Sequence, residues 1–350
     1  MSRKLNRRNF VAAAGLAGIA GLAGCSGGGG GGEGTEGEET TGGEGTTAGE
    51  ETTAGEETTE GEGGDGGSSR LSWHAGGTGG TYFPLSNEFK SVVEENTDYK
   101  LQVQSTGASV ENVGSLARGD ADFALIQNDI AYFAANGEGI DAFQGSPVKN
   151  LRGVATLYPE TIHIVTLANT GIEQPSDLSG ATINTGDLGS GTQVNAVQIL
   201  EALGISDYSE QNTGFSQASD QLRNGDIDAA FVVGGWPVGA IEELSATNDV
   251  RIVPIEGENR QAVMDSAPFY AEDEIPSGTY GLESAAPTVS VQAMIATNAE
   301  QPEQTVQEVT AAIFDNVDQL SIKTDFISKE SAQDGMSIDL HPGAQAYFGK

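Results

Sequence analysis

Two glycine-rich loops, each followed by a helical pattern, hold the residues of this chain that are best suited to chemistry. The first covers residues 76–85 (GGTGGTYFPL), and the second covers residues 186–195 (GDLGSGTQVN). Glycine lets a backbone approach a ligand closely, and the amides that open a helix are unpaired and carry the positive end of its dipole. Two such loops that face each other can hold one small anion from both sides, so we expect an anion site between them.

A nucleotide is a poor match to either loop. Neither loop has the Lys-Ser/Thr pair of a phosphate-binding P-loop, and neither has the full GxGxxG spacing of a dinucleotide site. Taken singly, each loop also fits a tight turn that binds nothing. The histidines, His74, His163 and His341, are too dispersed to suggest a metal motif. We expect neither a metal nor another cofactor.

The helical patterns after the loops predict which side chains pack inward. Pro84 suits the first turn of the first helix. The predicted buried residues of that helix recur at helical spacing and are Leu85, Phe89, Val92 and Val93. Those of the second helix are Val194, Val197, Leu200 and Leu203. Each helix would then pack one face inward while its N-terminal end faces a cleft.

The N-terminal residues 1–24 have the pattern of an export signal. Basic residues precede an uncharged run that ends at Ala23 and is too short to span a membrane comfortably. The pair Arg7 and Arg8 resembles a twin-arginine signal, which carries folded proteins. Cys25, the one cysteine of the sequence, follows Leu-Ala-Gly as in a lipobox, so we expect it to carry the lipid that anchors the mature chain outside the cell. The alternative is a chance cysteine behind an ordinary signal peptide.

The segment 25–69 and the overall charge restrict the partners of the protein. Gly, Glu and Thr dominate this segment, and its twelve acidic residues repel one another, so we expect an extended, solvated tether. The remaining 281 residues hold 39 Asp and Glu against 12 Lys and Arg. Such a charge disfavours nucleic acid and anionic membrane surfaces as partners. We interpret the acidity as an adaptation to very high salt, which screens the repulsion.

After the tether, short apolar runs alternate with helical patterns, which is typical of an α/β protein with mostly parallel strands. The predicted strands are 71–75, 99–104, 122–126, 154–158, 162–168, 181–184, 229–233, 250–254 and 288–297. The predicted helices are 82–95, 109–118, 128–135, 193–203, 217–223, 238–246 and 303–320. We expect two lobes: lobe I from 70–167 and 288–350, and lobe II from 168–287. Two strands that cross between the lobes would form the hinge.

The order of several motifs resembles the TAXI family of TRAP-associated extracytoplasmic solute-binding proteins. The motifs are GGTGGTYFPL, STGASVENVGSLARGDADFALIQND (105–129), LYPETIHIV (157–165), GSGTQVNAVQILEALGI (189–205), DAAFVVGGWP (228–237), IPSGTYGL (275–282) and LHPGAQAYF (340–348). The resemblance implies the two-lobed type II periplasmic-binding-protein fold. It also implies closure on a small carboxylate, such as glutamate, glutamine or 2-oxoglutarate, and delivery to a TRAP membrane permease.

The resemblance also implies which residues contact the ligand. They are Thr78, Gly79, Gly80, Thr81, Tyr82, Thr106, Gly107, Ala108, Ser109, Gln127, Asp129, Tyr158, Ser190, Gly191, Thr192, Asn195, Trp236 and Tyr280. Asp129 could pair with a substrate ammonium or cap the short helix that follows Gln127. Tyr158 could instead lie at the edge of the core, and Trp236 could simply cover lobe II. Trp236 also departs from the smaller residue that is usual in the family, which leaves the depth of the pocket open.

Three function classes remain to be compared. A monomeric binding protein leads, because the mature domain lacks a Cys nucleophile, a GxSxG elbow and an HExxH motif. An enzyme on the same fold is the rival, since its many carboxylates could serve a hydrolase. A lipoprotein that docks on a membrane sensor kinase is the third class.

Overall fold

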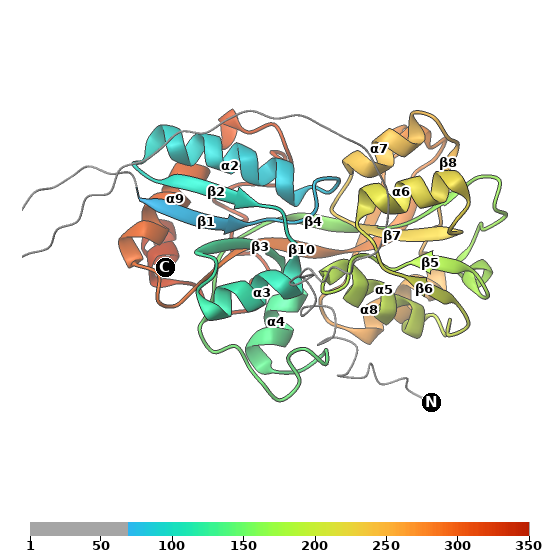
Figure 1. Ribbon diagram of the computed structural model, residues 1–350, viewed down its shortest axis with the longest axis horizontal. Helices are drawn as coiled ribbons and strands as arrows, with labels where there is room; N and C mark the ends of the chain where they lie inside the picture. Colours follow the sequence, from blue (N-terminus) through green and yellow to red (C-terminus); the bar gives the residue numbers. More distant parts are fainter. Residues whose placement is uncertain (1–68, 350) are drawn as a thin grey trace, which may run out of the picture. The chain divides into compact units, whose positions relative to one another are not determined.

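A ten-stranded sheet that runs through two lobes organises residues 69–349, the part of the chain that the computed structural model describes (Figure 1). The strands follow the order β2-β1-β3-β10-β4-β7-β5-β6, with β8 added beside β4 and β9 beside β10. The α/β fold class predicted from the sequence is confirmed. The export signal, the lipid on Cys25 and nearly all of the tether fall outside the described residues and stay predictions.

Lobe I contains the parallel strands β1 (Arg70–His74), β2 (Lys100–Gln104) and β3 (Phe123–Gln127). Helices α2 (Tyr82–Asn96), α3 (Ser109–Arg118) and α4 (Asn128–Asn136) follow these strands in turn. Helices α9 (Glu303–Phe314) and α10 (Pro342–Phe348) complete the lobe, and α9 packs beside α2. The helix predicted over 303–320 is therefore too long, because the chain leaves the α-helical conformation and continues as the short 3₁₀ turn Val317–Gln319.

Lobe II repeats this plan with five strands, of which three are only three residues long. These are β5 (Thr182–Asn184), β6 (Ser209–Gln211), β7 (Ala229–Val233), β8 (Val250–Ile252) and β9 (Ala271–Ile275). The helices are α5 (Gly191–Ala202), α6 (Phe215–Asn224), α7 (Gly239–Ser245) and α8 (Gly257–Ser266), with 3₁₀ turns at Pro175–Leu178 and Thr279–Gly281. The sequence analysis missed β6, α8 and β9 here and α10 in lobe I. All four lack a strong apolar repeat.

Two long antiparallel strands, β4 (Leu151–Leu167) and β10 (Ala286–Asn298), belong to both lobes (Figure 1). In lobe I they pair with each other and β10 also pairs with β3, whereas in lobe II β4 pairs with β7 and β8. The predicted hinge of crossing strands is therefore confirmed. The lobe boundaries expected at 167/168 and 287/288 stay proposals, because each shared strand serves both lobes.

The two strands predicted at 154–158 and 162–168 are one continuous strand, so that prediction is wrong. Pro159 and Glu160 interrupt the apolar run and look like a turn in the sequence. In the structure Pro159 pairs in register with Gln292, next to a register shift between Gln292 and Met294. Such an irregularity tolerates a proline, which has no N–H to donate to the ladder. The strand thus passes from one lobe to the other at this point.

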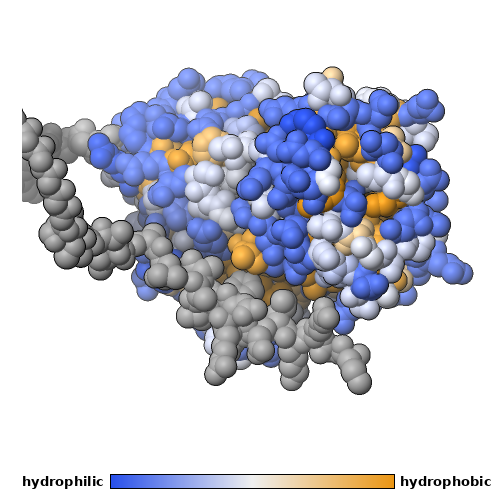
Figure 2. Space-filling view, turned by 45° about the vertical axis from the view of Figure 1, so that its right-hand side comes forward, coloured by the Kyte–Doolittle hydropathy of each residue, from blue (hydrophilic) through white to orange (hydrophobic). Residues whose placement is uncertain are grey.

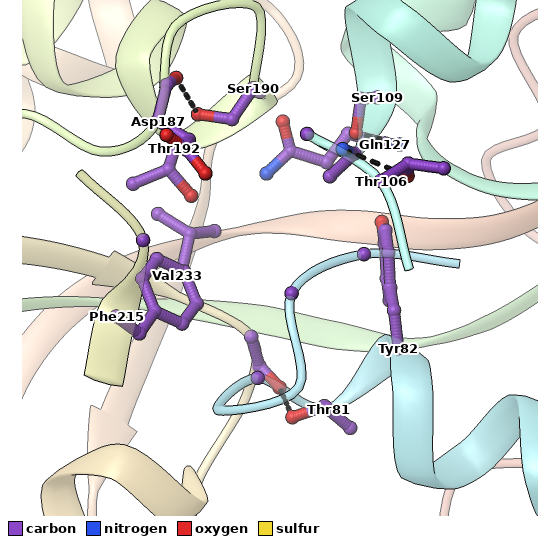
Figure 3. Close-up of a pocket in the computed structure, with 18 of the residues that line it drawn as sticks. Thr81, Tyr82, Thr106, Ser109, Gln127, Asp187, Ser190, Thr192, Phe215 and Val233 are labelled. Atoms are coloured by element: carbon purple, nitrogen blue, oxygen red, sulfur yellow. Dashed lines mark hydrogen bonds between the residues drawn. The ribbon is translucent and has the colours of Figure 1, made fainter. Parts of the chain in front are cut away.

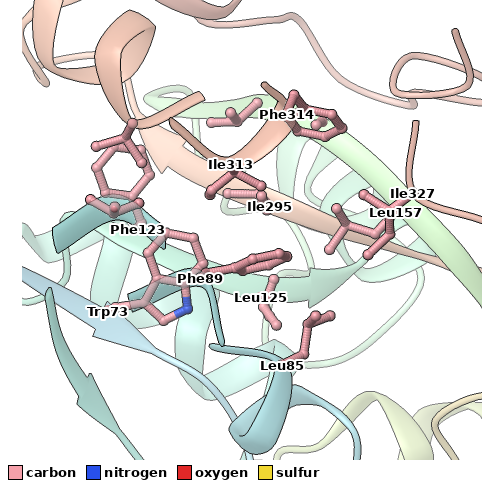
Figure 4. Packing of buried hydrophobic residues seen from close by; sticks show 14 of the residues in the cluster. Trp73, Leu85, Phe89, Phe123, Leu125, Leu157, Ile295, Ile313, Phe314 and Ile327 are labelled. Atoms are coloured by element: carbon pink, nitrogen blue, oxygen red, sulfur yellow. The ribbon is translucent and has the colours of Figure 1, made fainter. Parts of the chain in front are cut away.

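An aromatic cluster holds the first loop of lobe I in place (Figure 4). The Trp73 ring stacks on Phe123 with 5.6 Å between ring centroids and meets the edge of Phe89 at 5.8 Å. The indole Nε1 donates a hydrogen bond of 2.9 Å to the Ser86 hydroxyl, which lies in α2. Because Trp73 lies near the end of β1 and Phe89 lies in α2, this packing fixes the strand and the helix on either side of the glycine-rich loop. The buried face predicted for α2 is confirmed.

The buried face predicted for α5 is wrong in part. Leu200 is buried, but the other buried apolar positions are Ala196 and Ile199, whereas Val194 is only half-buried. This helix packs on the core of lobe II and also touches lobe I, where Val194 meets the cluster around α3 and α4. A helix with neighbours on two sides does not bury a single apolar stripe.

The surface agrees with the acidic composition. The face drawn in Figure 2 is mostly hydrophilic, with hydrophobic residues in small separate groups. Among the described residues, Leu188 and Phe326 are the large hydrophobic side chains that stay exposed. Leu188 lies in the second glycine-rich loop, at the boundary between the lobes.

Candidate functional site

A cavity of about 60 Å³ lies between the two predicted glycine-rich loops (Figure 3). Lobe I and the shared strand β4 line it with Gly76, Gly77, Gly79, Gly80, Thr81, Tyr82, Thr106, Gly107, Ala108, Ser109, Gln127 and Glu160. Lobe II lines it with Asp187, Ser190, Gly191, Thr192, Gly214, Phe215, Val233 and Gly234. The structure thus brings together twelve of the eighteen residues that the sequence analysis singled out.

The first loop reaches across to lobe II. The Thr81 hydroxyl donates a hydrogen bond of 2.6 Å to the Gly234 carbonyl, and the Ala240 amide donates one of 3.1 Å to the Gly79 carbonyl. A β-carbon on Gly79 would lie 2.3 Å from the Ser216 hydroxyl, so glycine permits this close approach. Because Thr81 uses its hydroxyl across the cleft, it does not cap α2. The first-turn amides of α2 have no partner within the helix. Thr81 and Tyr82, at the start of this helix, line the cavity.

The second loop makes the same kind of contact from the other side. The Gly189 carbonyl accepts hydrogen bonds from the amides of Val110 and Glu111, at 3.1 and 3.3 Å. This carbonyl therefore occupies the start of α3, so that helix start is not available to a ligand. The Ser190 hydroxyl caps α5 by accepting a hydrogen bond of 3.1 Å from the Gln193 amide. Gly191 and Thr192, the first residues of α5, line the cavity together with the start of α2.

The turn between β2 and α3 supports the cavity wall. Ala108 has φ of 68°, a left-handed conformation that costs a non-glycine residue energy. The Thr106 hydroxyl stabilises the turn, since it accepts a hydrogen bond from the Ala108 amide at 3.1 Å and donates one of 2.7 Å to Asn112. The Ser109 hydroxyl accepts one from the Gln127 amide at 3.1 Å. These hydroxyls hold backbone in place as well as lining the cavity.

Glu160 is the main lining residue that the sequence analysis did not single out. Its side chain is 2 % exposed, and it comes from β4 at the point where the strand passes between the lobes. The Tyr82 hydroxyl donates to its Oε2 at 3.1 Å, and the Tyr158 hydroxyl donates to its Oε1 at 3.4 Å. In the sequence Glu160 lies between two predicted strands, where Pro159 and Glu160 look like a turn, so no local pattern marks it as a buried carboxylate.

Glu160 has no ion-pair partner, although the ammonium of Lys323 lies near enough to interact with its charge. Burial raises the pKa of Glu160 to about 8, although the hydrogen bonds from Tyr82 and Gln127 oppose the shift. None of the ion pairs among residues 69–349 includes this carboxyl. Lys323 lies behind it, with its ammonium 5.8 Å from the Tyr158 ring centroid, but donates instead to the carbonyls of Trp236 and Pro237. The carboxyl is therefore mostly protonated at neutral pH.

Six of the predicted site residues do not line the cavity. They are Thr78, Asp129, Tyr158, Asn195, Trp236 and Tyr280. Thr78 is exposed at the tip of the first loop, and Tyr158 supports Glu160 from behind. Asp129 and Asn195 hydrogen-bond to each other across the lobes at 2.9 Å, so Asp129 neither lines the cavity nor acts as the N-cap of α4. Trp236 lines a separate cavity of about 180 Å³.

Tyr280 has a structural role in lobe II. Its hydroxyl accepts a hydrogen bond of 2.7 Å from the Val238 amide and lies 3.2 Å from His163 Nε2. His163 is fully buried in β4, and burial lowers its pKa to about 4, so the ring is neutral at physiological pH. This pair positions the start of α7 rather than the ligand.

Within residues 69–349 no group of three or more His, Cys, Asp or Glu side chains could hold a metal ion. The same residues contain no helix that is both long and apolar enough to cross a bilayer.

This chain matches one protein family in sequence and several solved structures in fold. Residues 74–349 match the NMT1-like family. MatC from Rhodopseudomonas palustris, solved with bound malate, is 12 % identical; the match covers 79 % of this chain and 95 % of that one, with a TM-score of 0.51. A putative L-cystine ABC transporter from Listeria monocytogenes is 14 % identical, with 75 % and 98 % covered and a TM-score of 0.44. The alkanesulfonate-binding protein SsuA from Xanthomonas axonopodis pv. citri is 13 % identical, with 80 % and 83 % covered and a TM-score of 0.43.

The two lobes, the shared strands and the cleft between them are those of the periplasmic-binding-protein fold. The family match spans nearly all of the described residues and includes both glycine-rich loops. The chain therefore belongs to the NMT1-like family.

Proposed function

We propose that this protein is an extracytoplasmic solute-binding protein that encloses a small carboxylate between its lobes. One observation carries the proposal: the starts of α2 and α5, one from each lobe, open onto the same cavity. Unpaired amides at helix starts stabilise an anion without a salt bridge. Since each lobe supplies only half of these donors, the anion is held best when the lobes are together.

A second feature of the cavity favours a ligand that also carries an ammonium. The buried carboxyl of Glu160 lines the cavity together with its partners Tyr82 and Gln127. A buried carboxyl without an ion-pair partner is stable either as the neutral acid or beside a positive charge that the ligand brings. We therefore propose an amino acid of the glutamate or glutamine type, with its carboxylate at the helix starts and its ammonium at Glu160. A dicarboxylate such as 2-oxoglutarate would instead require Glu160 to stay protonated.

The proposed partner is a TRAP-type membrane permease, on the strength of the motifs that resemble the TAXI family. The predicted lipid on Cys25 would keep the protein at the outer face of the membrane, and the tether would let it reach the permease. A sensor kinase is the alternative partner. Genes for a large multi-span permease next to the gene of this protein would favour transport.

Mass spectrometry of the compound released from denatured protein tests the ligand directly. Recovery of an intact amino acid or short carboxylate supports the proposal, whereas chemical turnover of that compound by the purified protein would point to an enzyme. Calorimetry with the recovered compound then tests the site through Thr192→Ala. Loss of one hydrogen bond to a charged group costs about 1.5–3 kcal/mol, or roughly tenfold to a hundredfold in affinity. Thr247→Ala, at an exposed position after α7, is the matched control.

A further inference from the structure

Asp129 and Asn195 join the two lobes through their side chains. Asp129 lies in the first turn of α4 in lobe I, and Asn195 lies in α5 of lobe II. The Asn195 Nδ2 donates a hydrogen bond of 2.9 Å to Asp129 Oδ2, and the two residues are 0 % and 1 % exposed, respectively. Neither lines the cavity of the candidate site. The pair is therefore a contact between the lobes that is separate from the lining of the cavity.

Each side chain of this pair has one oxygen without a hydrogen-bond partner. Among residues 69–349, few buried side-chain polar atoms have no hydrogen-bond partner, and they include Asp129 Oδ1 and Asn195 Oδ1. The two side chains already share one hydrogen bond, and in each of them one oxygen is left without a partner. The second hydrogen of Asn195 Nδ2 is directed to the Tyr270 hydroxyl at 3.3 Å, which in turn donates to Gln198 at 3.0 Å. Asn195 thus has both donors engaged and lacks only a donor for its oxygen.

An ionised carboxylate has no hydrogen to donate, whereas a carboxylic acid has one. A proton on Asp129 Oδ1 would donate to Asn195 Oδ1 and satisfy both unpaired atoms at once, which makes a two-bonded acid–amide pair. From this complementarity we propose that Asp129 and Asn195 form a latch that holds the lobes together by binding one proton. The latch rests on the proposed closure of the lobes but not on the identity of the ligand.

The opposite orientation of the Asn195 amide leads to the same conclusion. Oxygen and nitrogen of an amide exchange places when the group is turned over. The Asn195 oxygen would then face Asp129 Oδ2, and two acceptors would meet unless the carboxyl carried a proton. Both orientations therefore require protonated Asp129 for a fully bonded pair.

The surroundings of Asp129 also favour the proton. Burial raises its pKa to about 6, while Asn195 and the amides of Ile130 and Asp129 itself oppose the shift. The titratable groups that face it are Glu160 from β4 and Tyr270 from the segment before β9, and the charge of Asp129 raises the pKa of both. No ion pair among the described residues includes Asp129. When the lobes separate, water reaches the carboxyl and its pKa returns to about 3.9.

The sign of the pH dependence follows from these two values. Asp129 binds its proton more tightly when the lobes are together, so closure takes up a proton and is favoured at low pH. Through Asp129, the closing equilibrium should weaken roughly tenfold for each pH unit between about pH 4 and pH 6, and this contribution should level off above pH 6.

Spin labels can measure this closure without added ligand. Gln104 and Gln211 are exposed and end the edge strands β2 and β6, one in each lobe. Both would be replaced by cysteine in the full chain that also carries Cys25→Ser and Glu160→Gln, the latter because the buried carboxyl of Glu160 would add a pH response of its own. In this parent, the distance between the labels would be measured from pH 4.5 to pH 7.5. Because no ligand is added, a failure here is separate from a failure of the proposed function, which mass spectrometry and calorimetry detect.

The parent should shift toward the longer distance as the pH rises. Asp129→Asn places an amide opposite an amide, which can form both hydrogen bonds without a proton, so this variant should stay at the short distance throughout. Asn195→Ala removes the partner and should show the longer distance at every pH. Glu201→Gln, at an exposed position of α5, is the matched control and should keep the pH response of the parent. A parent distance that does not change with pH, or an Asp129→Asn variant that responds like the parent, would overturn the latch.

Discussion

Glu160 allows the charge of the ligand to be read from a pH profile. With a pKa of about 8, roughly one tenth of the molecules carry the charge at pH 7, so ionising the carboxyl costs about 1.4 kcal/mol there. In the protein with its lobes together, a ligand whose ammonium needs the carboxylate should therefore bind about tenfold more tightly for each pH unit between about 6 and 8. A dicarboxylate needs the protonated form, so its affinity should be flat up to about pH 8 and fall above it.

The assay is calorimetry of L-glutamate and 2-oxoglutarate, which differ mainly in the ammonium. At pH 7, two buffers of different ionisation enthalpy should reveal release of roughly 0.9 proton when the ammonium ligand binds. Glu160→Gln should remove both the proton release and the pH slope. It should weaken glutamate binding at pH 8 by roughly tenfold to a hundredfold, as expected for a lost hydrogen bond to a charged group.

Glu201→Gln, at an exposed position of α5, is the matched control and should bind like the parent. If Glu160→Gln binds glutamate as tightly as the parent and keeps its pH slope, Glu160 does not contact the ligand, and the reasoning from its burial fails. A flat profile for 2-oxoglutarate together with no binding of glutamate would instead assign a dicarboxylate to the cavity.

Three further predictions test the anchor, the charge and the fit of the lobes. Cys25→Ser should release the protein into the medium with ligand binding intact, and retention on the membrane would exclude the lipobox. The melting temperature should rise steeply with NaCl or KCl, because screening weakens the repulsion within an acidic domain; a flat response would refute the adaptation to high salt. Gly191→Ala should lower ligand affinity by about 1–3 kcal/mol in calorimetry, since the new methyl would lie 1.7 Å from Gln127 Oε1 and crowd the contact between the lobes; unchanged affinity would show that Gln127 moves aside freely.

The parts of the site that depend on local sequence were predictable. A run of glycines before an apolar helical repeat defines both helix starts, and the repeat Leu85, Phe89, Val92, Val93 is buried as its spacing predicts. The continuity of β4 was not predictable in this way, because a proline within a strand is tolerated only where its neighbour leaves the hydrogen-bond ladder irregular. That neighbour, β10, lies far away in the sequence.

The chemistry of the site depends on contacts that a local pattern does not contain. Glu160 receives a hydrogen bond from Tyr82, 78 residues away, and the burial that shifts its pKa arises from both lobes. Asp129 was expected to meet the ligand or to cap its helix, but it meets Asn195, which is 66 residues away. Residue type and spacing identify a carboxylate that could bind a ligand or cap a helix. Only the packed structure shows what faces it.

The place of β10 in the sheet has a consequence for biosynthesis. This strand lies between β3 and β4, although most of lobe II separates it from them in the sequence. The centre of the sheet in lobe I therefore stays open until the ribosome has made residue 298, and neither lobe can finish folding while the chain is still short. An export route that threads an unfolded chain through the membrane would leave this long-range pairing to form outside the cell. The predicted twin-arginine route would instead let the strand insert in the cytoplasm, and a chain that failed to insert it would not be exported.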